Sequence, residues 1–218
     1  MSSSNERKPT CLFKDKNKEP HMMKCDWTFY YLIPAKYNAD KNVDWKNYLN
    51  TLHDFNTFED FWAIIASIEP AWKLQKGCRY YIFKKGIEPL WEDERNLGGK
   101  EISIEYKHPQ KAGDPKQRRN DMQELSKIQK NCEEKWIRLC ASVFCHNTEY
   151  FKNIDKINGI EFNIRAQIIK VGIWTEKLNE EAEFQQLKDD LHKIMEFDPN
   201  DPIQNAKEND ITLERIQK

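Results

Sequence analysis

Residues 78–94 read CRYYIFKKGIEPLWEDE, a segment in which a strand pattern runs into a loop that carries one tryptophan. The aromatic and β-branched residues of 78–85 predict a β-strand, and Gly86 marks the turn that ends it. In the loop, Trp91 stands directly before three acidic residues, 92–94. A core tryptophan usually has apolar neighbours, whereas an acidic run usually lies in water. Their combination suggests a ligand that takes an aromatic face and a carboxylate together.

Strand and helix patterns lie on both sides of this segment. Further strands are predicted at 26–33, 101–106, 161–168 and 170–174, the last two as a hairpin. Three helices are predicted: one capped by Thr57 and ended by Pro70, one along the apolar stripe from Met122 to Val143, and one capped by Asn179. Strands interspersed with only three helices predict a single α+β domain with a mainly antiparallel sheet.

Composition limits the classes of function. The 218 residues carry 35 basic and 36 acidic side chains, a formal net charge of −1, which argues against a general nucleic-acid binder. The six cysteines form no CxxC pair and no zinc-like spacing with the histidines, and no apolar run approaches the ~20 residues of a membrane span. We therefore expect a protein of the cytoplasm, with the nucleus as a second compartment. Residues 1–20 and 198–218 are polar and are expected to be tails of a domain at 21–197.

Two loop tryptophans carry the first candidate chemistry. Guanine offers two adjacent donors that one carboxylate accepts, as Glu92 would, and its face needs an aromatic partner such as Trp91. A base with positive charge gains a cation–π contribution of roughly 0.5–2 kcal/mol on tryptophan. Trp45 repeats the pattern on a separate polar loop. The alternative for both is a half-buried tryptophan that covers the edge of the core.

A second set of candidates is basic. Arg165 lies on the polar side of its predicted strand and Lys170 follows just past the turn, so the two could converge on phosphates. Solvated surface charges are the alternative. In the first predicted helix, Trp62 shares a face with Phe58 and Ile65, which fits either a core position or a docking stripe for a partner helix.

Five segments taken in order resemble the eukaryotic translation initiation factor 4E family, which binds the 7-methylguanosine cap of messenger RNA. They are HMMKCDW, FNTFEDFWAI, GIEPLWEDE, NIRA and GIWT, and the resemblance runs from about His21 to near Met195. It implies a curved, mainly antiparallel sheet with three helices packed on its convex face. It implies neither a cofactor, nor a metal, nor a catalytic residue.

The resemblance also implies a role for each candidate residue. Trp45 and Trp91 would sandwich the methylated base, Glu92 would accept its N1 and N2 protons, and Trp174 would contact the N7-methyl group. Arg165, Lys170 and Lys100 would bind the phosphates. A helix of a 4G-type scaffold factor, or of a 4E-binding repressor, would dock on the opposite surface, at His21, Met22, Phe58, Trp62, Ile137 and Ala141.

Several positions depart from the family pattern. Lys100 stands where arginine is usual, Glu101 replaces a tryptophan, and Gln167 replaces a lysine, changes that make the phosphate region less positive. Met22, Phe58 and Ala141 reshape the partner groove. Residues 111–130 exceed the usual family length.

Three readings of the function follow. The first is a cap-binding factor that recruits the scaffold to start translation; tryptophan at both stacking positions favours it. The second is a repressor homologue that competes for caps without recruiting the scaffold, which the altered groove leaves open. The third, an enzyme acting on caps, is rejected because the sequence has no HxHxH arrangement, no Gly-Glu-rich hydrolase signature and no cofactor loop.

Overall fold

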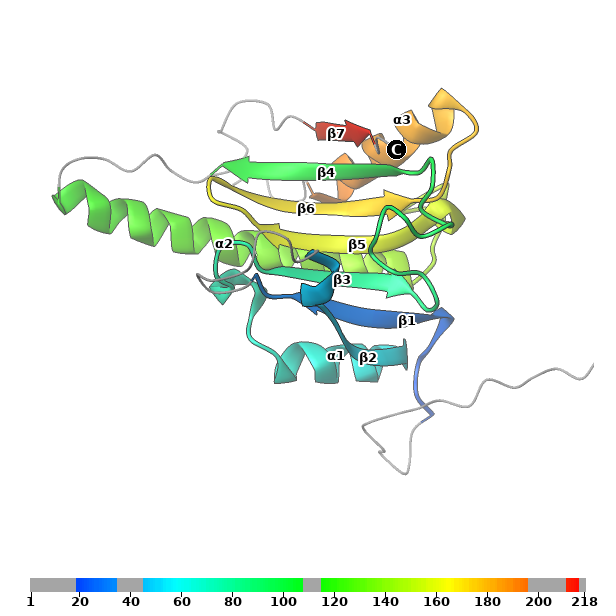
Figure 1. The fold of residues 1–218 in the computed structure, drawn as a ribbon, viewed down its shortest axis with the longest axis horizontal. Coiled ribbons are helices and arrows are strands. Elements are labelled where there is room, and N and C mark those ends of the chain that lie inside the picture. The colour runs from blue at the N-terminus through cyan, green and yellow to red at the C-terminus, as the bar shows by residue number, and fades with distance from the viewer. Residues whose placement is uncertain (1–18, 35–44, 108–114, 196–210, 216–218) are drawn as a thin grey trace, which may run out of the picture.

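Seven antiparallel strands form one curved sheet in the computed structural model, which describes residues 19–34, 45–107, 115–195 and 211–215 (Figure 1). The sheet order is β2-β1-β3-β5-β6-β4-β7, and every neighbouring pair is antiparallel. The strands are β1 (Met22–Leu32), β2 (Leu49–Thr57), β3 (Arg79–Lys84), β4 (Lys100–Lys107), β5 (Ile157–Ile164), β6 (Ile168–Thr175) and β7 (Ile211–Arg215).

Three α-helices cover one face of the sheet, behind it in the view of Figure 1. They are α1 (Phe58–Ser67), α2 (Pro115–Phe144) and α3 (Glu181–Met195), and three short 3₁₀ turns, η1 (Trp45–Tyr48), η2 (Ala71–Lys73) and η3 (Ile154–Lys156), lie in connections. The main core lies between this face and the helices. The predicted α+β class with three helices on the convex face of an antiparallel sheet is confirmed.

The apolar stripe of α2 explains how the helix packs. Trp136 and Leu139 are fully buried under the sheet, as residues three and four apart on one helical face should be. Met122, at the other end of the stripe, is 73% exposed because α2 extends beyond the sheet there (Figure 1). The basic segment 111–130 thus includes the first half of α2, and 111–114 lies outside the described residues.

The helix caps follow the sequence in one case and depart from it in the other. Thr57 Oγ1 accepts from the backbone N–H of Asp60 at 3.1 Å, the predicted N-cap of α1. At α3 the predicted cap was Asn179, but the carboxylate of Glu183 is the acceptor, and the backbone amides of Asn179 and Glu180 donate to it.

Four element boundaries correct the sequence prediction. β2 was not predicted, because as an edge strand it keeps polar residues along most of its length. The predicted strand 161–168 is broken by a hairpin turn at 165–167, which contains no glycine or proline to signal it. α2 begins at Pro115, before the predicted apolar stripe that starts at Met122, since proline suits a first helical turn. β7 lies inside the predicted tail 198–218 and pairs with β4.

The face of the sheet away from the helices, here called the open face, carries a second and smaller apolar cluster. Its buried members are Tyr30, Leu32, Tyr81, Phe83, Ile87 and Trp174, and the loop residue Trp91 packs against them. Gly159 makes room for one of these side chains, because a Cβ there would lie 2.3 Å from the Phe83 ring. The candidate site is built on this open face.

Candidate ligand-binding site

The loop between β3 and β4 is held in shape by its own polar side chains. The Asp93 carboxylate accepts from the backbone amides of Glu88 and Arg95, at 2.8 and 2.9 Å. The buried Asn96 amide donates to two loop carbonyls at 2.8 Å each, and Asn158 of β5 donates to the Asn96 side chain at 3.1 Å. These bonds fix the position from which Trp91 extends over the sheet.

Trp91 lies flat against Trp174 of β6. The two ring centroids are 3.3 Å apart and the ring planes differ by 8°. Trp174 is 3% exposed, and its indole N–H donates to Glu161 Oε2 at 2.8 Å. One face of Trp91 is therefore covered by Trp174, so a base that stacks on Trp91 in this arrangement uses the opposite face.

A pocket of about 280 Å³ opens beside this stack. Its aromatic lining is Trp91, Trp174 and Tyr81. A planar aromatic wall with one exposed tryptophan face is suited to a flat heterocycle, especially a cationic one.

The rest of the pocket lining is charged. Two arginines, Arg79 and Arg165, and two glutamates, Glu101 and Glu161, complete it. Arginine forks bind carboxylates and phosphates with two parallel hydrogen bonds. The arrangement can therefore take a ligand with a flat base and an anionic part.

A buried ion pair lies at the β4–β6 side of the pocket. Lys170 Nζ contacts Glu101 Oε1, and the two residues are 0% and 2% exposed. Pairing offsets the free-energy cost of removing these two charges from water, because a buried charge without a partner is strongly destabilising. Lys170 thus offsets the acid that Glu101 brings into the site.

Arg79 and Tyr81 form a second polar pair on β3. Arg79 Nη1 donates to Tyr81 Oη at 3.0 Å. Burial first, then the charge of Glu161, raises the pKa of Tyr81 well above its usual value, so the phenol stays protonated. Burial alone lowers the pKa of Arg79, but Tyr81, Glu161 and Glu101 together outweigh it and raise that pKa. The arginine stays charged.

The structure brings together only part of the predicted ligand site. Trp91, Trp174 and Arg165 line the pocket, and Lys170 lies buried beside it. Glu92 is exposed and is not part of the pocket lining. Trp45 is the first residue of η1, and its side chain lies outside the described part of the chain.

Lys100 lies away from the pocket in this structure, so its role as a phosphate ligand stays a prediction. Its ammonium lies 4.1 Å from the centroid of the Phe184 ring and 3.6 Å from Glu181 Oε2, both in α3. The reason is strand alternation: Lys100 shares a face with Ile102, which is buried under the helices, whereas Glu101 points to the open face.

Sequence reasoning did not assign Arg79, Tyr81 or Glu161 to the site. Arg79 and Tyr81 stand two apart in β3, on the face that carries the pocket. Glu161 is 2% exposed, an unusual position for an acid, and its place on the polar side of the predicted strand was the available signal.

The predicted partner surface includes exposed apolar side chains beside α1. Trp62 is 49% exposed and Met22 is 41% exposed. His21 is tied to α1, because its Nδ1 lies 2.6 Å from Glu59 Oε1 and its carbonyl accepts from Phe58 N at 3.0 Å. The bond from His21 lowers the pKa of Glu59. Phe58 and Ile137 are partly buried against the main core, and Ala141 is half-buried.

Comparison with known proteins identifies the family of this chain. The family model described as eukaryotic initiation factor 4E matches residues 22–217. The chain belongs to this family. Initiation factor 4E of Candida albicans is 28% identical over 191 residues, which are 88% of this chain and 81% of that protein. The Aplysia californica factor is 31% identical over 156 residues, 71% of this chain and 61% of that one.

Solved structures of initiation factors 4E have the same fold. Factor 4E-3 of Ascaris suum in complex with an m2,2,7G cap gives a TM-score of 0.63 at 27% identity, over 83% of this chain and 87% of that one. The same factor with an m7G cap gives 0.64. Factor 4E-3 of C. elegans with the 4E-binding protein Mextli gives 0.65 at 25% identity, over 84% of this chain and 90% of that one.

Members of this family are initiation factors that bind caps and are not enzymes. Among the residues that the structure describes, no group of histidine, cysteine and acidic side chains is arranged to hold a metal ion. Nor is any of the described helices long and apolar enough to cross a membrane.

Proposed function

We propose that this protein binds the 7-methylguanosine 5′ cap of messenger RNA, with the methylated base stacked on Trp91. The observation that supports this most directly is the flat stack of Trp91 on the buried Trp174 beside a pocket with two arginines. Methylation at N7 makes guanine cationic, which strengthens stacking on an indole face. Arg165 then binds the phosphate bridge.

The base has two routes of entry into this stack. It can take the outer face of Trp91, with Trp45 as the second wall of the sandwich. It can also displace Trp91 from Trp174 and bring the N7-methyl group to Trp174. In both cases Glu92 follows Trp91 in the chain with an exposed carboxylate, available to accept the N1 and N2 protons of guanine.

The test is a tryptophan fluorescence titration with 7-methyl-GTP beside unmethylated GTP. We expect strong quenching by 7-methyl-GTP and a much weaker response to GTP. Glu92→Gln should lower the affinity for 7-methyl-GTP by at least about tenfold, because the glutamine amide keeps only one acceptor oxygen and turns its NH2 group toward the other guanine donor. Glu94→Gln is the matched control, since Glu94 is an exposed acid of the same loop. Equal, weak quenching by both nucleotides would contradict the proposal.

We propose further that the surface around Trp62 recruits a scaffold initiation factor of the 4G type, through a short amphipathic helix. The exposed Trp62 and Met22 side chains support this, since exposed aromatic and methionine side chains are frequent anchors at such interfaces. The C. elegans structure with Mextli shows that a family member binds a 4E-binding protein. Repressor proteins that bind factor 4E are candidate partners too.

A cap-dependent translation extract depleted of its own factor 4E separates initiator from repressor. An initiator restores translation of a capped reporter when it is added back. A repressor homologue leaves the depleted extract inactive and inhibits an undepleted one. We expect restoration, together with the cytoplasmic location of an initiation factor.

A further inference from the structure

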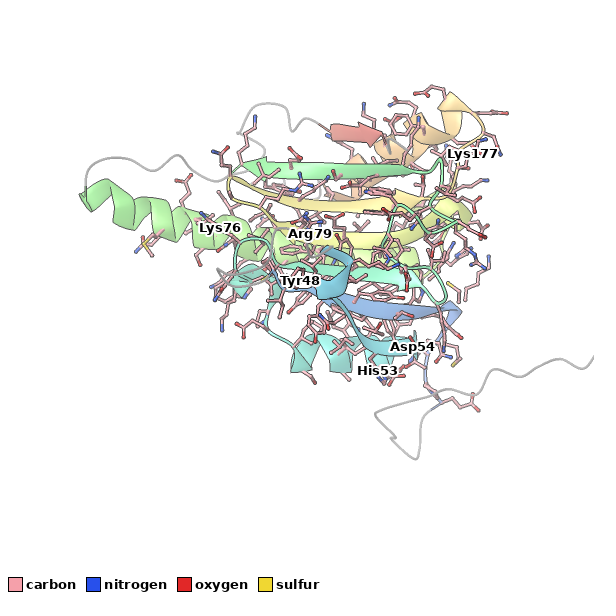
Figure 2. The ribbon with its side chains drawn as sticks, in the orientation of Figure 1. Tyr48, His53, Asp54, Lys76, Arg79 and Lys177 are labelled. Carbon is pink, nitrogen blue, oxygen red and sulfur yellow. The ribbon has the colours of Figure 1, made fainter. Side chains whose placement is uncertain are left out.

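Arg79 is a half-buried cation with a defined geometry in the pocket. Arg79, labelled in Figure 2, is the first residue of β3. It pairs across the sheet with Asn163, two residues before Arg165. One end of its guanidinium is held by Tyr81 Oη at 3.0 Å. Its Nε is buried and has no hydrogen-bond partner among the residues that the structure describes. A guanidinium held at one end, with a buried donor left over, is preorganised for an anionic ligand.

The charge balance of the site depends on Arg79. Glu101 and Glu161 bring two negative charges, and Arg165 and Lys170 bring two positive ones. These four charges cancel, so the guanidinium of Arg79 decides whether the site is neutral or positive. A polyphosphate requires a positive site, because desolvated anions bind only where cations compensate them.

Lys100 does not supply the missing charge in this structure. Its ammonium lies over Phe184 and beside Glu181, on the helical side of the sheet. The pocket lining holds only two cations among the described residues, Arg79 and Arg165.

We propose that Arg79 is a phosphate ligand of this pocket and that, together with Arg165, it binds the polyphosphate bridge of the cap. This inference rests on the proposed function, since it names a further binding residue of the same site. The contribution of Arg79 to binding affinity should therefore increase with the number of phosphates on the ligand and be absent for a nucleoside.

The experiment compares three probes: 7-methylguanosine, 7-methyl-GMP and 7-methyl-GTP, each titrated against wild type and Arg79→Gln. We expect the variant to lose about tenfold or more in affinity for 7-methyl-GTP, less for 7-methyl-GMP, and under about twofold for the nucleoside. The salt dependence of 7-methyl-GTP binding should also become shallower. Lys76→Gln is the matched control, because it removes an exposed positive charge three residues away (Figure 2).

Two results would overturn the inference. An equal loss for all three probes would mean that Arg79 acts only by holding Tyr81 and the sheet in place. Unchanged affinity for 7-methyl-GTP would mean that its guanidinium does not touch phosphate. If Arg79→Gln does not fold, Arg79→Lys replaces it: the charge stays but the fork is lost, so an intermediate loss confined to the phosphorylated probes is expected.

Failure of the proposed function gives a different pattern. If wild type binds GTP and 7-methyl-GTP equally, and Arg79→Gln weakens both, cap recognition fails while the phosphate role of Arg79 stands. If wild type binds neither nucleotide, both proposals fail.

Discussion

The indole N–H of Trp174 donates a 2.8 Å hydrogen bond to the carboxylate of Glu161, and both residues are buried. The second oxygen of Glu161 accepts from the Asn163 side chain, also at 2.8 Å. One carboxylate thus fixes the orientation of the tryptophan on which Trp91 rests. An acid in this position links the interior of the sheet to the aromatic wall of the pocket.

This relationship makes a prediction about Glu161. Glu161→Ala leaves two buried donors without an acceptor, which should lower the free energy of unfolding by about 1–3 kcal/mol for each donor. Glu161→Gln keeps one acceptor oxygen and should fall between wild type and the alanine variant. Urea unfolding measures the three stabilities. If glutamine and alanine were equally destabilising, the hydrogen bonds to Glu161 would not be what stabilises Trp174.

The ion pair of Glu101 and Lys170 predicts that substitutions at the two positions have strongly coupled effects on stability. Lys170→Met removes the cation from a carboxylate that is 2% exposed, and should cost about 3–5 kcal/mol of unfolding free energy. The double variant Glu101→Leu with Lys170→Met removes both charges and should recover most of that loss. A double-mutant cycle in urea measures the coupling. Additive losses in the cycle would show that the two side chains do not depend on each other.

The fold was predictable because its apolar residues follow clear periods. The stripe of α2 and the alternation in β4 each assign one face to the core. β2 was not predicted because an edge strand needs little apolar surface. The β5–β6 turn was not predicted because its three residues carry no turn signal. A local sequence pattern does not show the contacts and hydrogen bonds that a strand gains by pairing with a neighbouring strand.

The site was predictable only where a motif marks it. Trp91 and Arg165 lie in recognisable segments, whereas Arg79 and Tyr81 sit in a strand that reads as ordinary aromatic β-structure. Their role depends on cross-strand register, which places Arg79 opposite Asn163 and Tyr81 opposite Glu161. The orientation of Lys100 toward the helices could have been predicted from strand alternation, because Ile102 lies on the same face of β4.

Alkaline pH should destabilise the fold through Tyr80. Burial, followed by the charge of Glu69, raises the pKa of Tyr80 to about 12, and its hydroxyl donates to the Glu69 carbonyl at 2.8 Å. A folded pKa above the unfolded value of about 10 means that this stabilisation is complete below pH 10 and is lost as pH rises toward 12. Unfolding free energy measured from pH 9 to pH 12 should fall less steeply in Tyr80→Phe.

The control for Tyr80 is Tyr150→Phe, which removes an exposed tyrosine and leaves Tyr80 in place. It should keep the alkaline slope of wild type. If the unfolding free energy of Tyr80→Phe fell with pH as steeply as that of wild type, groups other than Tyr80 would cause the loss of stability at alkaline pH.

Trp62 should separate partner binding from cap binding. Its side chain is 49% exposed, so Trp62→Ala should change the unfolding free energy by less than about 1 kcal/mol. The same change should reduce the affinity for a 4G-type peptide helix with a tyrosine and a leucine-hydrophobic pair by at least tenfold, about 1.4 kcal/mol. Fluorescence anisotropy of the labelled peptide and titration with 7-methyl-GTP measure the two affinities side by side. The exposed Leu97→Ala is the matched control, because Leu97 belongs to the loop between β3 and β4, outside the predicted partner surface, and should leave peptide affinity unchanged. Equal loss of peptide and cap affinity in Trp62→Ala would identify Trp62 as a structural residue and remove the basis for a separate partner surface.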